Sequence, residues 1–177
     1  MKLFTNLVQL SYLVDDVEAA ASGWSQATGI GPWFFAERME ITDYRYRGRP
    51  ASTAAVSVAM TYVGSVQLEL IRPARDAGPT LFDEFIHAAR MPAMHHAAFM
   101  EPDYDLTYRG AIDRGFVVAH EGDTYRGRLV YFENPALPGA IVELCEATPE
   151  RVRIYEAMQR ICSTWDGTQP IRRAWPD

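Results

Sequence analysis

Alternating hydrophobic and polar positions mark the start of the chain as a strand. Residues 7–14 alternate in this way and are rich in side chains that favour β-structure. A helical pattern follows, with Asp15 or Asp16 placed to cap its start and Gly29 placed to end it. Strand patterns then recur three times, over residues 33–41, 53–62 and 65–72. The first part of the chain is therefore predicted to be a β-α-β-β-β unit.

The same order of elements recurs in the second half, as a strand, a helix and three further strands: residues 94–101, 103–115, 116–121, 128–133 and 140–146. Two helical patterns lie outside the two units, at residues 81–90 and from Thr148 and Pro149 to about Ser163. The last residues, 167–177, are expected to form an irregular tail. One structural domain with four segments is predicted: a first module over 1–73, a linker and helix over 74–92, a second module over 93–147, and a C-terminal helix and tail over 148–177.

Short sequence repeats support this internal duplication. Tyr-Arg-Gly-Arg occurs at 46–49 and again at 125–128. Val-Gln-Leu-Glu-Leu-Ile at 66–71 corresponds to Ala-Ile-Val-Glu-Leu-Cys at 140–145, and Gln-Leu-Ser-Tyr at the first strand corresponds to His-Ala-Ala-Phe in its later counterpart. Each copy carries two residues that are able to bind a metal. If approximate two-fold symmetry relates the copies, four candidate ligands converge: Gln9, Glu69, His96 and Glu143.

The chemistry of these four side chains suits a divalent cation. Glu69 and Glu143 each lie within an apolar strand, where a carboxylate is costly unless it has a partner. Two ionised carboxylates neutralise a divalent ion, while imidazole and amide groups supply neutral donors. The predicted cofactor is one divalent metal ion: Zn, Ni, Co, Mn, Mg or Fe(II), among which these ligand types do not select. Taken singly, each residue is more often an ordinary structural one, so the prediction rests on the set.

This pattern resembles the vicinal oxygen chelate superfamily, which includes glyoxalase I, methylmalonyl-CoA epimerase, extradiol dioxygenases and bleomycin-resistance proteins. The resemblance extends over about residues 7–147 and is strongest at 66–73, 94–99 and 141–144. It implies an α+β fold in which two tandem βαβββ modules form a cup-shaped mixed sheet around a metal. It also implies that His96 rather than His95 is the ligand, and that His95 points away.

The resemblance implies a glyoxalase-like, metal-dependent lyase or isomerase that enolises a substrate next to its carbonyl. Glu143 and Glu69 are the candidate bases; Glu37 and Glu40 are weaker candidates that are more simply exposed strand acids. The ligand order is similar to that of zinc-type glyoxalase I, but residues 23–29 lack its Phe-Tyr and Leu-Gly-Met signature, which argues against a glutathione hemithioacetal. The alternatives are a non-catalytic resistance-type binding protein, an acyl-thioester epimerase and, disfavoured by the single matched His, an Fe(II) dioxygenase.

The expected partner is a small-molecule substrate that is bulky and apolar and carries a chelating oxygen pair. Five side chains are candidates to line its pocket: Trp33, Phe35, Tyr62, Met100 and Tyr131. Arginines also cluster at 45–49 and 72–75. They are interpreted either as solvated loop residues or as contacts to an anionic group on the substrate.

Composition argues against several other classes of protein. The chain has 177 residues, 48% of them hydrophobic and 23% charged, as in ordinary globular proteins. A net charge of -6 without a dense basic stripe argues against nucleic-acid binding. We expect no signal peptide and no membrane span, and two cysteines do not make a disulfide framework. A cytoplasmic protein is predicted. Exposed apolar edges and the C-terminal helix predict a homodimer, with closure within a single chain as the alternative.

Overall fold

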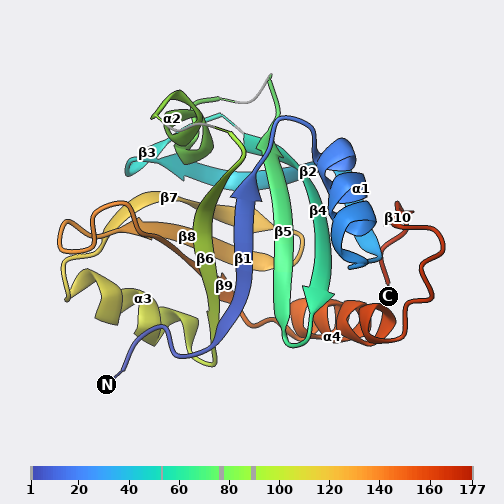
Figure 1. Cartoon of the computed structure of the whole chain (residues 1–177). Helices are drawn as coiled ribbons and strands as arrows, with labels where there is room; N and C mark the ends of the chain where they lie inside the picture. The colour runs from blue at the N-terminus through green and yellow to red at the C-terminus, as the bar shows by residue number, and fades with distance from the viewer. Residues whose placement is uncertain (1, 53, 76–77, 89–90, 177) are drawn as a thin grey trace.

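The computed structural model describes residues 2–52, 54–75, 78–88 and 91–176. The first half contains β1 (Leu7–Leu13), α1 (Val17–Thr28), β2 (Trp33–Tyr46), β3 (Arg49–Pro50), β4 (Ala54–Val63) and β5 (Val66–Pro73). A short helix follows, α2 (Leu81–Ala88). The rest comprises β6 (Ala93–Glu101), α3 (Tyr104–Ile112), β7 (Val117–Thr124), β8 (Gly127–Glu133), β9 (Ile141–Glu146), α4 (Pro149–Ser163) and β10 (Ile171–Arg172) (Figure 1).

The two halves pair their strands in the same way. In the first half β1 is parallel to β5, which continues into antiparallel β4 and β2. In the second half β6 is parallel to β9, which continues into antiparallel β8 and β7. Antiparallel pairing of β1 with β6 joins the halves into one mixed sheet. The predicted α+β fold with a curved mixed sheet is confirmed, while the predicted segment boundaries stay a prediction.

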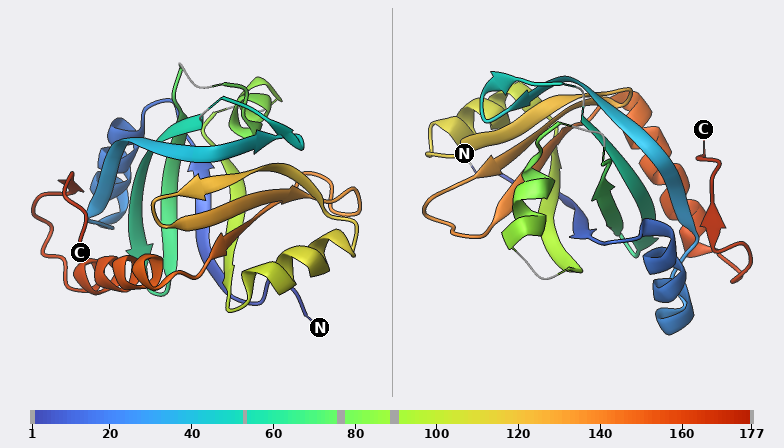
Figure 2. Two further views of the ribbon diagram at one scale, coloured as in Figure 1. Left: turned by 180° about the vertical axis from the view of Figure 1, so that it is seen from behind. Right: turned by 90° about the horizontal axis from the view of Figure 1, so that it is seen from above.

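The sheet also closes on itself within the single chain, which was the alternative to closure by a partner. The end of β2 pairs with β7, through Thr42 with Asp123, Arg45 with Glu121 and Tyr46 with His120. The strand order β2-β4-β5-β1-β6-β9-β8-β7 therefore returns to β2 and forms a barrel. Figure 2 shows β2 and β7 side by side across the barrel from β1. The strand predicted to end at residue 41 continues to Tyr46 because its last residues belong to this closing ladder.

Helices cover the outside of the barrel and close its ends. Helix α1 packs on β4 and β5, α3 on β6 and β9, and α4 on β4. The predicted caps are confirmed for two of them: the Asp16 carboxylate accepts from the Ala19 amide, and the Thr148 hydroxyl accepts from the Arg151 amide. Helix α2 inserts Phe82 into the barrel interior, and α4 contributes Tyr155 at the other side of the same cavity. The interior is therefore enclosed.

The C-terminal tail is more ordered than predicted. β10 pairs with Trp33 and Phe34 of β2, so the prediction of an irregular tail is wrong at Ile171–Arg172. The indole Nε1 of Trp175 donates to the Phe35 carbonyl at 3.2 Å, which holds the tail along β2.

Parts of three predicted segments cannot be compared with the structure. The predicted end of the linker helix at residues 89–90, the first residue of the strand at 53 and part of the linker at 76–77 lie outside the described residues. Within the described part of the chain, no helix has the length and apolar character needed to cross a membrane.

Candidate functional site

Three of the four predicted ligands meet inside the barrel. Glu69 of β5, His96 of β6 and Glu143 of β9 are all buried, and His96 is only 1% exposed. The His96 Nε2 atom lies 2.8 Å from Glu143 Oε2 and 3.7 Å from Glu69 Oε2. Two carboxylates and one imidazole therefore converge from three neighbouring parts of the sheet.

The strand register explains this convergence. Ser11 of β1 is paired with Glu69 on one side and with His96 on the other. Ala98, two residues after His96 on the same strand, is paired with Glu143. Because side chains two residues apart point to the same face, all of these groups face the interior. The Ser11 hydroxyl donates to Glu69 Oε2 at 2.7 Å and fixes that carboxylate.

The fourth predicted ligand, Gln9, is held by a residue that sequence reasoning missed. The Gln9 amide nitrogen donates to Gln67 Oε1 at 2.6 Å, and both side chains are buried. Gln9 lines the same cavity as Glu69 and Glu143. With its nitrogen bound to Gln67, the Gln9 carbonyl oxygen accepts no hydrogen bond from the described residues and is the atom left to act as a donor to an ion. Nothing in a lone strand Gln signals such a partner.

His95 does not point away from His96. In the β1–β6 ladder Ser11 faces His96 and Tyr12 faces Met94, so His95 is bulged out of the register. Its Nδ1 atom lies 2.8 Å from His96 Nδ1, an interaction in which one nitrogen carries the proton and the other accepts it. This contact occupies His96 Nδ1 and leaves Nε2 to face the two carboxylates. The side chain of His95 thus orients the predicted ligand.

The two carboxylates differ in their protonation. Burial raises the pKa of Glu69 to about 7, against the opposing effect of His96. Burial would also raise the pKa of Glu143, but the imidazole of His96, 2.8 Å away, outweighs burial and lowers that pKa to about 2. Cys145 assists by donating to Glu143 Oε1 at 3.0 Å. At neutral pH the barrel therefore holds one firmly ionised carboxylate and one that is about half protonated.

The space between these groups is small. The enclosed cavity has a volume of about 30 Å³, which is room for about one water molecule. Its polar lining combines side chains from the sheet, the β7–β8 turn and α4: Gln9, Glu69, Thr124, Arg126, Tyr131, Glu143, Cys145, Arg151 and Tyr155. The ring of Tyr131 lies 4.8 Å from that of His96, measured between ring centroids, and burial raises the Tyr131 pKa well above its usual value.

The other candidate residues lie elsewhere. Trp33 belongs to the cluster under α1, and Tyr62 packs against the cluster under α4. Phe35 lines an outer groove together with the two weaker acid candidates, Glu37 and Glu40. Met100 is paired with Cys145 in the β6–β9 ladder and is not among the residues that line the enclosed cavity. Of the five predicted pocket residues, Tyr131 is the one that the structure places beside the carboxylates.

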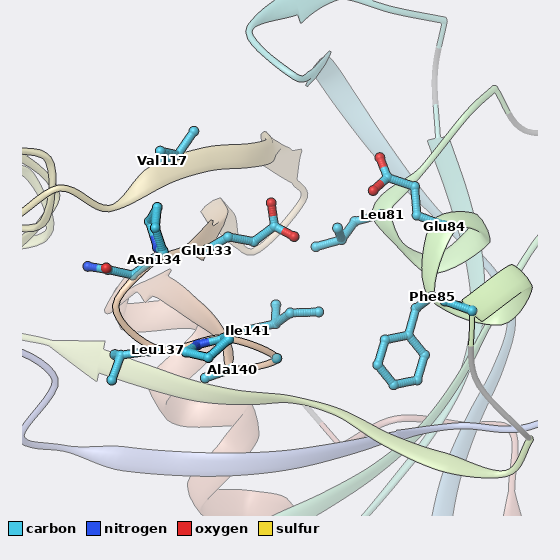
Figure 3. Close-up of a pocket in the computed structure, with 13 residues that line it drawn as sticks. Leu81, Glu84, Phe85, Val117, Glu133, Asn134, Leu137, Ala140 and Ile141 are labelled. Atoms are coloured by element: carbon cyan, nitrogen blue, oxygen red, sulfur yellow. The ribbon is translucent and has the colours of Figure 1, made fainter.

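Two open grooves flank the barrel. The first, of about 500 Å³, lies between α2 and the loop that joins β8 to β9 (Figure 3). Its opening carries Glu84 and Glu133 on opposite walls, and the guanidinium of Arg47 forms ion pairs with both. The second, of about 640 Å³, lies between β2, the β7–β8 turn and the C-terminal tail.

The converging side chains suit a divalent metal ion in donor type, and their spacing lies close to the range that such an ion needs without matching it. His96 Nε2 is a buried nitrogen without a properly oriented hydrogen bond, even though a Glu143 oxygen is 2.8 Å away. Two donors about 2.1 Å from one ion stand roughly 3.0–3.4 Å apart at octahedral or tetrahedral angles. The observed separations of 2.8 and 3.7 Å bracket that range. Among the residues described, no group of three or more His, Cys, Asp or Glu side chains has the geometry to hold a metal ion as the side chains stand.

Comparison with known proteins identifies the architecture. Residues 8–132 match the family model of the Glyoxalase/Bleomycin resistance protein/Dioxygenase superfamily, a range that includes Gln9, Glu69 and His96 but not Glu143. A search of curated proteins gives no match.

Solved structures with the same fold include two epimerases. Methylmalonyl-CoA epimerase from Mycobacterium tuberculosis is 16% identical, with a TM-score of 0.60 over 86% of this chain and 95% of that one. The Streptomyces coelicolor epimerase in complex with 2-nitronate-propionyl-CoA is 15% identical, with a TM-score of 0.56 over 82% and 96%. A hypothetical protein from Bacillus halodurans C-125 is 14% identical, with a TM-score of 0.58 over 81% and 94%. At these identities the likeness shows the fold alone.

Proposed function

Because the chain belongs to the glyoxalase/bleomycin resistance/dioxygenase superfamily, we propose that it is a metal-dependent isomerase or lyase that moves a proton next to a substrate carbonyl. The observation that supports this most strongly is the convergence of Glu69, His96 and Glu143 in the barrel interior, where the two carboxylates line the cavity. Burying a carboxylate costs free energy, so two buried acids in one cavity indicate a functional role. Glu69 and Glu143 come from equivalent strands of the two halves, as expected of a proton-transfer site formed by duplication.

In this proposal Gln9, Glu69, His96 and Glu143 hold the divalent ion. When bound, the ion would polarise a substrate carbonyl and increase the acidity of the adjacent C–H group. Glu69 is the proposed group that accepts and returns the proton, because the Ser11 hydroxyl orients its carboxylate and burial in the metal-free chain raises its pKa. Glu143 remains ionised beside His96 and supplies the compensating negative charge.

The surrounding residues prepare Glu69 and His96 for these roles. Ser11 fixes the orientation of the Glu69 carboxylate, and His95 occupies the far nitrogen of His96. Tyr131 and Phe82 exclude water from the cavity, so the interactions between its charges are weakly screened. An acyl-thioester epimerase would use the same proton transfer at a single carbon, and the substrate tested below separates it from a lyase or isomerase.

The experiment combines metal analysis with isotope exchange. The purified chain should retain about one divalent ion per molecule. In deuterated water it should incorporate deuterium next to the carbonyl of its substrate, sought among small aldehydes, ketones and acyl thioesters. Glu69→Gln should retain the fold and lose at least about 100-fold of the exchange rate. Glu146→Gln is the matched control, because Glu146 lies on β9 near Glu143 but pairs with Arg128.

Two results would contradict the proposal. One is a chain that binds no divalent ion and catalyses no exchange with any substrate of the panel, which would leave a non-catalytic binding protein of this fold. The other is an equal loss of exchange in Glu69→Gln and Glu146→Gln, which would show that the enclosed carboxylates have no special role. Oxygen consumption in place of proton exchange would indicate a dioxygenase.

A further inference from the structure

Arg126 is a buried positive charge for which the described structure supplies no acidic partner. It lies in the turn between β7 and β8 and is 4% exposed. Its guanidinium stacks on the rings of Trp175 at 3.8 Å and Tyr125 at 4.6 Å, and its Nη2 donates to the Tyr125 hydroxyl. The buried Nε–H meets no acceptor, and no Asp or Glu of the described residues forms an ion pair with the side chain.

Two other arginines show how this chain normally satisfies such a group. Arg151 is equally buried, and it donates to the backbone carbonyls of Glu146 at 2.6 Å and Gly127 at 3.1 Å, so it is a structural clamp. Arg47 holds the same place as Arg126 in the repeated Tyr-Arg-Gly-Arg motif, and it pairs with two carboxylates. A buried guanidinium without a counterion is costly, and stacking on aromatic rings offsets only part of that cost. Arg126 is therefore a charge arranged for a partner that the chain itself does not supply.

The location of Arg126 indicates where that partner would come from. The side chain lines both the open groove beside the C-terminal tail and the enclosed cavity that contains Glu69 and Glu143. Arg126 therefore lies where the groove and the cavity adjoin.

We propose that Arg126 binds a carboxylate group of the substrate and places the neighbouring carbon against the acids of the cavity. The anion-binding part of this inference stands on the geometry of Arg126, and the catalytic part rests on the proposed function. A stacked guanidinium keeps its planar edge of N–H donors free, which matches a carboxylate in two parallel hydrogen bonds.

The size and charge of the surroundings favour a carboxylate over a phosphate. The cavity that Arg126 shares with the acids has a volume of about 30 Å³, so only a small group fits beside the guanidinium there. The groove also carries Glu37 and Glu40, and the cavity carries Glu69 and Glu143. A doubly charged phosphate would be repelled by these four acids more strongly than a single carboxylate.

The test compares isobutyrate with isobutyramide, which have nearly the same shape and differ in charge. Binding is followed by nuclear magnetic resonance on the full chain with ¹⁵N-labelled arginine, after EDTA treatment so that no metal ion contributes. The signal of the Arg126 Nε–H, identified by its absence in Arg126→Lys, should move on titration with isobutyrate. We expect the acid to bind at least about tenfold more tightly than the amide, and Arg126→Gln to weaken acid binding about 10- to 100-fold.

Arg173→Gln provides the matched control. Arg173 lines the same groove, but it is exposed and paired with Glu18, so its removal should change acid binding by no more than about twofold. Thermal unfolding of each variant shows whether it is folded. If Arg126→Gln does not fold, the acid and amide titrations of the unaltered chain decide the question.

The inference is overturned if acid and amide bind equally, if the Arg126 signal does not move, or if Arg173→Gln loses binding as much as Arg126→Gln does. A failure of this inference can be distinguished from a failure of the proposed function. Charge-selective binding without deuterium exchange would leave the anion subsite intact and refute the catalytic proposal. Deuterium exchange without charge-selective binding would support the catalytic proposal and refute the anion subsite.

Discussion

Replacing Glu69 with Gln should stabilise the metal-free protein at alkaline pH and have little effect at acidic pH. Glu69 is buried, and its pKa rises from the usual 4.5 to about 7 on folding. A carboxyl group whose pKa is raised on folding favours the folded state fully below pH 4.5. This contribution is lost as the pH rises towards 7. At 1.36 kcal/mol per pH unit, the loss is about 3 kcal/mol at pH 8. Gln keeps the size of the side chain and the oxygen that accepts from Ser11, but it cannot ionise.

Urea unfolding of the two proteins at pH 4.5 and pH 8, in the presence of EDTA, measures this effect. The stability difference between Glu69→Gln and the unaltered chain should grow by about 3 kcal/mol from the lower to the higher pH. For a chain of this size that corresponds to a rise of about 6–12 °C in melting temperature at pH 8.

Glu146 supplies a control of opposite sign. The hydrogen bond from Arg128 lowers the pKa of Glu146, so its contribution to stability is present above pH 4.5 and lost as the pH falls below that value. Glu146→Gln should therefore destabilise the protein at pH 8. The reasoning on Glu69 is refuted if its Gln variant is no more stable than the unaltered chain at pH 8, or if the difference between them does not depend on pH.

Three further substitutions test other parts of the structure. Glu143→Gln removes the ionised partner of His96 and should lower deuterium exchange at least about 100-fold in the isotope assay; near-normal exchange would contradict its role. His95→Phe removes the contact to His96 Nδ1 and should weaken metal affinity about 10- to 100-fold in a chelator competition, and unchanged affinity would show that this contact is incidental. Thr148→Ala removes the cap of α4 and should cost about 1 kcal/mol in urea unfolding, whereas a change in metal affinity would not be expected.

Local patterns in the sequence predicted the helices and most strands, because alternation and caps depend on neighbouring residues. Asp16 and Thr148 cap their helices as predicted. The extension of β2 to Tyr46 was missed because its partner strand, β7, is far away in the chain. The β10 strand was missed because two residues carry too little pattern to distinguish a strand from a loop.

The sequence predicted only those residues of the candidate site that lie within the internal repeat. Glu69, His96 and Glu143 lie at equivalent positions of two similar units, and the structure brings them together. His95 was misjudged because a bulge shifts a single residue out of regular alternation, and no residue type in that segment signals it. Arg126 was seen only as part of a repeated motif, because its isolation from acidic groups depends on the folded arrangement of Trp175 and Tyr125 around it.

Closure of the barrel through β2 and β7 has a consequence for assembly. Both halves of the acid cluster come from one polypeptide, and the ring that surrounds them is completed by that same polypeptide. A partner chain is therefore not needed to bring Glu69, His96 and Glu143 together. A monomeric variant should therefore retain full turnover per chain, and dilution should leave specific activity constant.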